Sequence, residues 1–181
     1  MLGATTVNKA MRLRAARGRR GGKDEFMEIR EVIEADEKSG ICGAVLRALP
    51  KWFGNPAAIE GYVAEAREKP FYGAFDNGAP VGFVCIKIHN EHTAEIYVMG
   101  VLEAYHRLGT GRRFVSICES FCAERKMEFL TVKTLDGSDP DVNYRKTRLF
   151  YTACGFVPLE VFPLYWDKDN PCLFLAKHIK L

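Results

Sequence analysis

Apolar residues recur along the chain at two different spacings, one typical of strands and one typical of helices, and so predict a mixture of both. Runs rich in β-branched and aromatic residues predict strands at 27–32, 71–75, 81–88, from Ala94 onward, 129–134, 156–162 and 172–177. Apolar stripes at helical spacing predict helices that begin at Asp36, after the cap Asn55, after Gly111 and at Asn143. Strands and helices interleaved in this way predict an α+β fold with a mixed sheet.

The first 24 residues differ from the rest, and we expect them to be a disordered basic tail before a single domain at 25–181. Residues 1–23 hold seven lysines and arginines and no acid. Because the whole chain carries +3, removing those seven cations leaves −4 for the remainder. An acidic body favours a cationic substrate over a nucleic acid, although a basic arm that binds nucleic acid stays an alternative.

The stretch from Ala94 to Arg112 reads as a strand, a short glycine turn and the start of a helix. Glycines let a ligand approach the backbone, and the first turn of a helix offers free N–H groups to an anion. Arg107, Arg112 and Arg113 add positive charge beside the turn. The pattern therefore predicts a phosphate-binding turn.

Two common phosphate motifs do not fit this turn. A dinucleotide fingerprint needs a third glycine where Phe114 stands, and a P-loop needs Lys where Arg112 follows Gly111. The segment His106–Gly111 instead resembles motif A of the GNAT acetyltransferase superfamily, with His106 in place of the usual Gln or Arg. Asn143–Phe156 resembles the last helix and following strand of the same superfamily, with Thr147 where Ala is commonest.

This resemblance covers about residues 27–177 and implies a GNAT fold with a splayed central sheet. It implies acetyl-CoA as cosubstrate and no metal. The central strand would offer its backbone to the thioester and pantetheine, with a bulge at Gly100. The residues that it places on acetyl-CoA are Met99, Gly100, Val101, His106, Arg107, Leu108, Gly109, Thr110, Gly111, Arg112 and Asn143. Asn143 could equally be the N-cap of its helix.

Acetyl transfer to an amine needs a proton donor for the thiolate and a way to deprotonate the amine. The resemblance makes Tyr151 the candidate acid and Glu95 the candidate base. Strand alternation places Glu95 on one face with Tyr97 and Met99. A chain of water molecules is an alternative to Glu95, and His89 and His92 are secondary candidates.

The acceptor site is expected to combine aromatic and acidic side chains, which suit an ammonium group. The group comprises Trp52, Phe53, Tyr97, Tyr165, Trp166, Glu95, Asp136, Asp139 and Asp141. We therefore expect an N-acetyltransferase that acts on a small cationic amine such as an aminated antibiotic or a polyamine. Acetylation of a protein or peptide, or a silent acetyl-CoA-binding module, are the alternatives.

The six cysteines form no C-x-x-C pair, which favours reduced core residues in a cytoplasmic protein over a zinc or disulfide framework. No apolar run reaches the roughly 18 residues of a membrane span, so no membrane partner is expected. A homodimer is left open.

Overall fold

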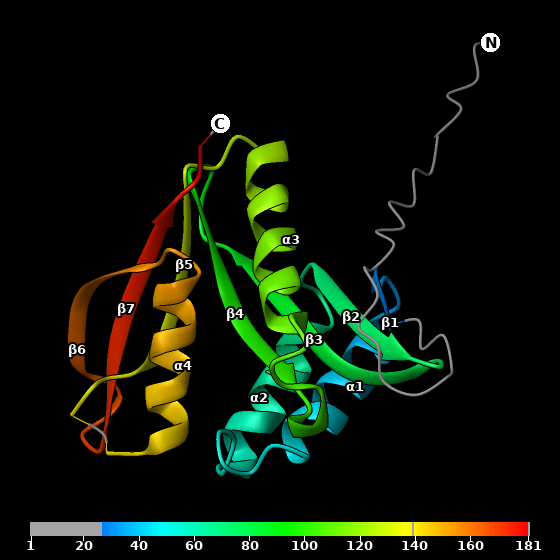
Figure 1. Cartoon of the computed structure of the whole chain (residues 1–181), viewed down its shortest axis with the longest axis horizontal. Helices are drawn as coiled ribbons and strands as arrows, with labels where there is room; N and C mark the ends of the chain where they lie inside the picture. Colours follow the sequence, from blue (N-terminus) through cyan, green and yellow to red (C-terminus); the bar gives the residue numbers. More distant parts are fainter. Residues whose placement is uncertain (1–26, 139, 181) are drawn as a thin grey trace.

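The computed structural model describes residues 27–138 and 140–180, which form a seven-stranded sheet with helices on both faces (Figure 1). The strands are β1 (Met27–Glu31), β2 (Phe71–Asp76), β3 (Ala79–Ile88), β4 (Thr93–Val101), β5 (Phe129–Leu135), β6 (Val157–Asp167) and β7 (Asn170–His178). The helices are α1 (Ala35–Arg47), α2 (Pro56–Ala66), the short 3₁₀ turn η1 (Glu103–Tyr105), α3 (Thr110–Glu124) and α4 (Val142–Ala153). The expected basic tail and Asp139 lie outside the described residues.

The sheet runs in the order β1-β2-β3-β4-β5-β7-β6, and this confirms the predicted mixed α+β fold. Neighbouring strands are antiparallel except β4 and β5, which are parallel. That parallel pairing covers only Thr93–Ile96 against Phe129–Val132, although both strands continue beyond it. The two strands therefore diverge toward their C-terminal ends, as Figure 1 shows.

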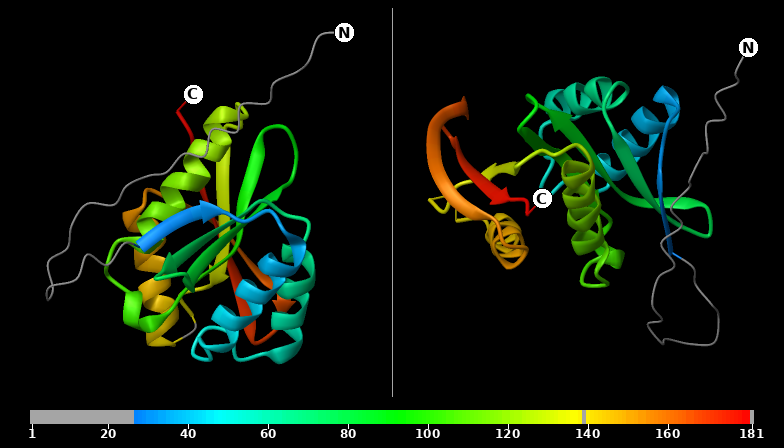
Figure 2. Two further views of the ribbon diagram at one scale, coloured as in Figure 1. Left: turned by 90° about the vertical axis from the view of Figure 1, so that its right-hand side faces the viewer. Right: turned by 90° about the horizontal axis from the view of Figure 1, so that it is seen from above.

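Two apolar clusters cover the two faces of the sheet. On one face α1 and α2 pack over β2 and β3, and on the other α3 and α4 pack over β4 and β5, as the views in Figure 2 show. Asn55 caps α2 as predicted, because its side chain accepts hydrogen bonds from the N–H groups of Ala57 and Ala58. The α1/α2 cover does not extend to β6, an edge strand that is almost entirely exposed.

The bulge in the central strand lies elsewhere than predicted. Cys85 pairs with Val98 and Ile86 pairs with Ile96, so Tyr97 is the extra residue and Gly100 pairs regularly with Phe83. The bulge changes which side chains share a face. Met99 packs on the α3 side, whereas Tyr97 packs on the α1/α2 side, so the predicted common face for Glu95, Tyr97 and Met99 is wrong for Met99.

All six cysteines are free and buried, which agrees with the expected core role. Burial raises the pKa of the Cys42 and Cys85 thiols to about 12 and that of the Cys122 and Cys172 thiols to about 11. In the same described part of the chain, no helix combines the length and apolar character of a membrane crossing.

Candidate active site

The divergence of β4 and β5 opens a cleft of about 1190 Å³. Its walls are the C-terminal halves of both strands, the loop after α1, the first turns of α2, the turn before α3, the first three turns of α4 and the turn between β6 and β7. A parallel pair that separates leaves backbone N–H and C=O groups without strand partners, and these groups can bind an extended ligand. The sheet thus supplies a ligand site as a consequence of its topology.

The two glycines of the predicted phosphate turn are needed for different reasons. Gly109 precedes α3 at φ +86°, a conformation that L residues rarely adopt. Gly111 lies in the first turn of α3, where an added Cβ would come within 3.1 Å of the Phe150 ring. The first glycine therefore permits the turn, and the second permits close packing of α3 against α4.

The eleven predicted cofactor residues divide into seven that line the cleft and four that do not, among them Gly109. Seven of them line the cleft: Met99, Gly100, Val101, His106, Arg107, Gly111 and Asn143. The side chains of three others are directed elsewhere. Leu108 is 62% exposed, Thr110 is buried with its hydroxyl donating to Met27 Sδ, and Arg112 donates to the carbonyl of Ala153. Any contact of these three residues with a phosphate would therefore come from backbone N–H groups.

His106 stands where the superfamily motif has Gln or Arg, and here it connects the turn to the central strand. Its Nε2 lies 2.7 Å from the carbonyl oxygen of Val101, a distance at which Nε2–H donates to that oxygen. Its ring also makes an edge-to-face contact with Trp52, with 5.5 Å between ring centroids. The histidine therefore holds the end of β4 and one wall of the cleft together.

The N-cap of α4 is Asp141, so the alternative reading of Asn143 as the cap is wrong. Asp141 accepts hydrogen bonds from the N–H groups of Asn143 and Tyr144. Asn143 lies in the first turn with its side chain at the cleft. Next to it, the Tyr144 hydroxyl donates to the carbonyl of Trp52 at 2.5 Å and joins α4 to the loop after α1.

Tyr151 lies on α4 at the inner end of the cleft, where it is 6% exposed. Edge-to-face contacts with Phe150 and Phe156 fix its ring. Burial, with smaller effects from Cys118 and Cys154, raises the pKa of the Tyr151 phenol well above its ordinary value. No described residue forms a hydrogen bond with its hydroxyl, which leaves this group to a ligand in the cleft.

Glu95 is 4% exposed and is held by two cationic or titratable partners. Lys133 Nζ donates to Glu95 Oε1 at 2.7 Å, and His89 Nε2 lies 2.5 Å from Oε2. Glu95 does not line the large cleft, but Lys133 does. The other secondary candidate, His92, pairs with Glu128 on an exposed edge.

The acceptor group predicted from the sequence is only partly assembled. Its five aromatic residues all line the cleft: Trp52, Phe53, Tyr97, Tyr165 and Trp166. Of its described acids, only Asp141 lines the cleft. Asp136 lies outside the cleft lining and accepts a hydrogen bond from the Ser138 N–H, which lowers the pKa of its carboxyl, and Asp141 caps α4.

Several cleft residues were not predicted from the sequence, among them Lys133, Thr134 and Tyr144. Thr134 Oγ1 is fully shielded from solvent and has no hydrogen-bond partner in the described structure. Alternation along β5 places Lys133 on the same face as Thr131, and a lysine within so apolar a strand was the available signal. No cluster of His, Cys, Asp and Glu with metal-binding geometry occurs at 27–138 or 140–180.

Solved structures of acetyltransferases have the same fold as this chain. A structure described as a GNAT-family acetyltransferase from Desulfovibrio desulfuricans superposes with a TM-score of 0.71 at 16% identity, covering 85% of this chain and 99% of that one. An aminoglycoside 6'-N-acetyltransferase complexed with coenzyme A gives 0.66 at 19% identity, covering 84% and 97%. The ribosomal-protein-S18-alanine N-acetyltransferase from Escherichia coli gives 0.66 at 13% identity, covering 84% and 95%.

The sequence itself settles the family. The family model described as Acetyltransferase (GNAT) family matches residues 37–156, which is more than half of the chain. The protein therefore belongs to the GNAT acetyltransferase family, as the motif resemblance predicted. No curated protein matches the sequence significantly.

Proposed function

We propose that this protein transfers the acetyl group of acetyl-CoA to the primary amine of a small molecule. The observation that carries the proposal is the convergence, in one cleft, of a glycine turn at the start of α3, the separated ends of β4 and β5, and the unpartnered hydroxyl of Tyr151. These three features correspond to the diphosphate, the pantetheine arm and the sulfur of acetyl-CoA. The structural relative with coenzyme A supports the same choice of cosubstrate.

Charge in the cleft also suits an anionic cosubstrate. Arg107 and Lys146 line it near the start of α3 and α4. Basic side chains and the free N–H groups at the beginning of α3 both stabilise phosphate oxygens. The turn at Gly109 leaves the N–H groups at the start of α3 without side-chain caps.

Within this proposal Tyr151 is the acid that protonates the departing thiolate. Its raised pKa keeps the hydroxyl protonated throughout the neutral range. The same dry surroundings would also raise the pKa of the leaving thiol, so the two groups stay matched for proton transfer. The backbone of Met99–Val101, which lines the cleft, would bond the thioester carbonyl and the pantetheine arm.

Glu95 remains our candidate for receiving the amine's proton, directly or through water. His89 Nε2 lies 2.5 Å from Glu95 Oε2, and the His89 side chain is partly exposed to solvent. A proton that arrives at Glu95 can therefore pass to His89 and from there to solvent.

The acceptor expected from the sequence is a small cationic amine, and acetylation of a peptide amine is the alternative. Of the described carboxylates assigned to that acceptor, Glu95 is already paired with Lys133 and Asp141 is already a helix cap. The proposed function therefore assigns only the reacting group of the acceptor, which is a primary amine.

Two measurements test the proposal. Calorimetry should show binding of acetyl-CoA to the full chain, and release of free CoA should accompany incubation with a panel of small amines, peptides and polyamines. Binding without thiol release from any amine would indicate the silent module. Absence of acetyl-CoA binding by a folded protein would overturn the proposal.

A further inference from the structure

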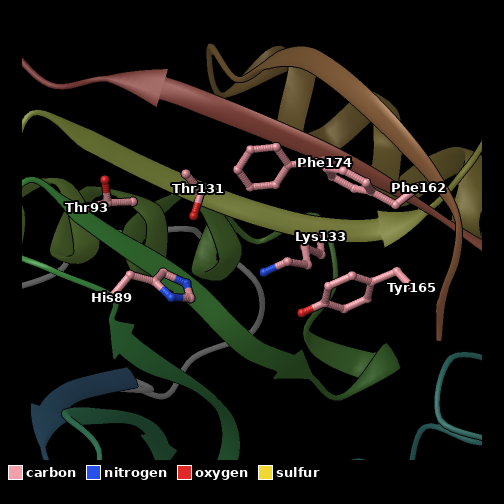
Figure 3. Close-up of a pocket in the computed structure, with 7 residues that line it drawn as sticks. All are labelled: His89, Thr93, Thr131, Lys133, Phe162, Tyr165 and Phe174. Atoms are coloured by element: carbon pink, nitrogen blue, oxygen red, sulfur yellow. The ribbon is translucent and has the colours of Figure 1, made fainter.

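A second, smaller pocket lies on the α1/α2 side of the sheet beneath β6. Its volume is about 330 Å³, and its lining is mostly apolar. Figure 3 shows its residues: His89, Thr93, Thr131, Lys133, Phe162, Tyr165 and Phe174. Lys133 and Tyr165 also line the large cleft, so the two cavities meet at these two side chains.

The aromatic part of this pocket is built by β6 and β7. The Phe162 ring lies 6.1 Å from Phe174 and 6.4 Å from Tyr165, centroid to centroid, in tilted arrangements. A volume at the low end of ligand cavities holds one side group and not a whole cosubstrate. Aromatic walls of this kind suit a ring or a branched apolar group.

In the polar part of the pocket, Lys133 lines both cavities, whereas its ion-pair partner Glu95 lines neither. Lys133 Nζ faces the rings of Tyr165 and Phe174 at 5.3 and 5.7 Å, and it donates to Glu95. An ammonium has three N–H donors, and no other acceptor for this one occurs among the described side chains. Figure 3 shows Lys133 and His89 directed into the same space.

We infer that this pocket selects the acceptor, and that the acceptor is an aromatic or bulky apolar primary amine that also carries a carboxylate. The inference rests on the proposed function. The ring occupies the pocket beneath β6, the carboxylate accepts from Lys133 at the junction, and the amine extends into the large cleft toward the thioester. A polycation is disfavoured because the Lys133 ammonium lines both cavities, whereas the Glu95 carboxylate lines neither.

Pairs of acceptors that differ in one group test the Lys133 ammonium and the aromatic pocket separately. The rate constant kcat/KM for phenylalanine should exceed that for 2-phenylethylamine by roughly tenfold or more, because only phenylalanine supplies a carboxylate to the Lys133 ammonium. It should exceed that for alanine by about tenfold or more, because only phenylalanine fills the aromatic pocket. Spermidine should be the poorest substrate of the four.

Two variants test which residue causes each substrate preference. Lys133→Met should remove the preference for phenylalanine over 2-phenylethylamine and raise the relative rate with spermidine. Phe162→Ala should remove the preference for phenylalanine over alanine. Phe129→Ala is the matched control, since Phe129 is an exposed aromatic of β5 that contacts His178 outside this pocket, and it should leave both ratios unchanged.

The outcomes distinguish this inference from the proposed function. Failure of the wild-type protein to bind acetyl-CoA overturns the proposed function. Acetyl-CoA binding together with a preference for spermidine or 2-phenylethylamine over phenylalanine, or a ratio unchanged in Lys133→Met, overturns the inference alone. If Lys133→Met does not fold, the double variant Glu95→Gln/Lys133→Met removes both charges of the pair. The quantity measured is then the calorimetric affinity for phenylalanine in the presence of CoA, in place of kcat/KM.

Discussion

Replacing Tyr151 by phenylalanine tests the proposed chemistry with the least disturbance of the fold. The ring is fixed by edge-to-face contacts with Phe150 and Phe156, and phenylalanine retains both contacts. The deleted hydroxyl has no hydrogen-bond partner in the described structure, so no internal hydrogen bond is lost. We expect the free energy of unfolding to change by less than about 1 kcal/mol.

The effect on turnover should be much larger. A positioned general acid contributes about a hundredfold or more, which corresponds to roughly 2.7 kcal/mol of transition-state stabilisation. Steady-state kinetics with a saturating amine should therefore show kcat reduced about a hundredfold or more, with the calorimetric affinity for acetyl-CoA retained. Phe150→Leu, which alters packing beside Tyr151 without touching a hydroxyl, is the control for disturbed packing.

The pH dependence gives an independent test of the same residue. Burial raises the pKa of the Tyr151 phenol, so the protonated form is favoured in the folded state. This raised pKa stabilises the folded protein at every pH below the ordinary tyrosine pKa of about 10. The stabilisation is lost as the pH rises through the higher pKa of the folded state. Any alkaline loss of activity below about pH 10 should persist in Tyr151→Phe. Near-wild-type kcat in this variant would refute the proton-donor role.

Three further predictions concern the turn, the carboxylate and the tail. Gly109→Ala and Gly78→Ala should each cost about 1–2 kcal/mol of stability, since both glycines have positive φ and open space around an added Cβ, but only Gly109→Ala should weaken acetyl-CoA binding in calorimetry. Glu95→Gln should lower kcat more than acetyl-CoA affinity and change the acidic limb of the pH–rate profile; an unchanged limb would assign the base to water or His89. Removal of residues 1–24 should leave the melting temperature and acetyl-CoA affinity nearly unchanged, and a large loss of stability would show that the tail packs on the domain.

The glycine turn could be predicted because its cause is local. A positive φ at Gly109 and the free N–H groups of the next turn depend on a few consecutive residues. The order of the elements followed from periodicity for the same reason. The last hairpin was predicted too short, because β6 continues past a register shift between Phe162 and Asp167 that interrupts the alternation.

The pairing of Glu95 could not be predicted, because it depends on register between distant segments. Lys133 lies 38 positions further along the chain and reaches Glu95 only because β4 and β5 pair in parallel with Glu95 opposite Thr131. The position of the bulge at Tyr97 is likewise set by pairing with β3 and not by a glycine. Side chains that meet across strands, including most of the acceptor pocket, follow from tertiary register.

The buried thiols also determine how this enzyme can be studied. All six are shielded from solvent, and burial raises the pKa of several of them, so the native protein should contribute little to a colorimetric thiol assay of released CoA. The thiols lie on α1, β3, α3 and β7 and just after α4. Because a thiol reagent modifies each one only when its segment opens, the rate of labelling at each cysteine measures the opening free energy of that segment. One reagent can thus follow catalysis in the native protein and compare the local stability of two strands and three helices.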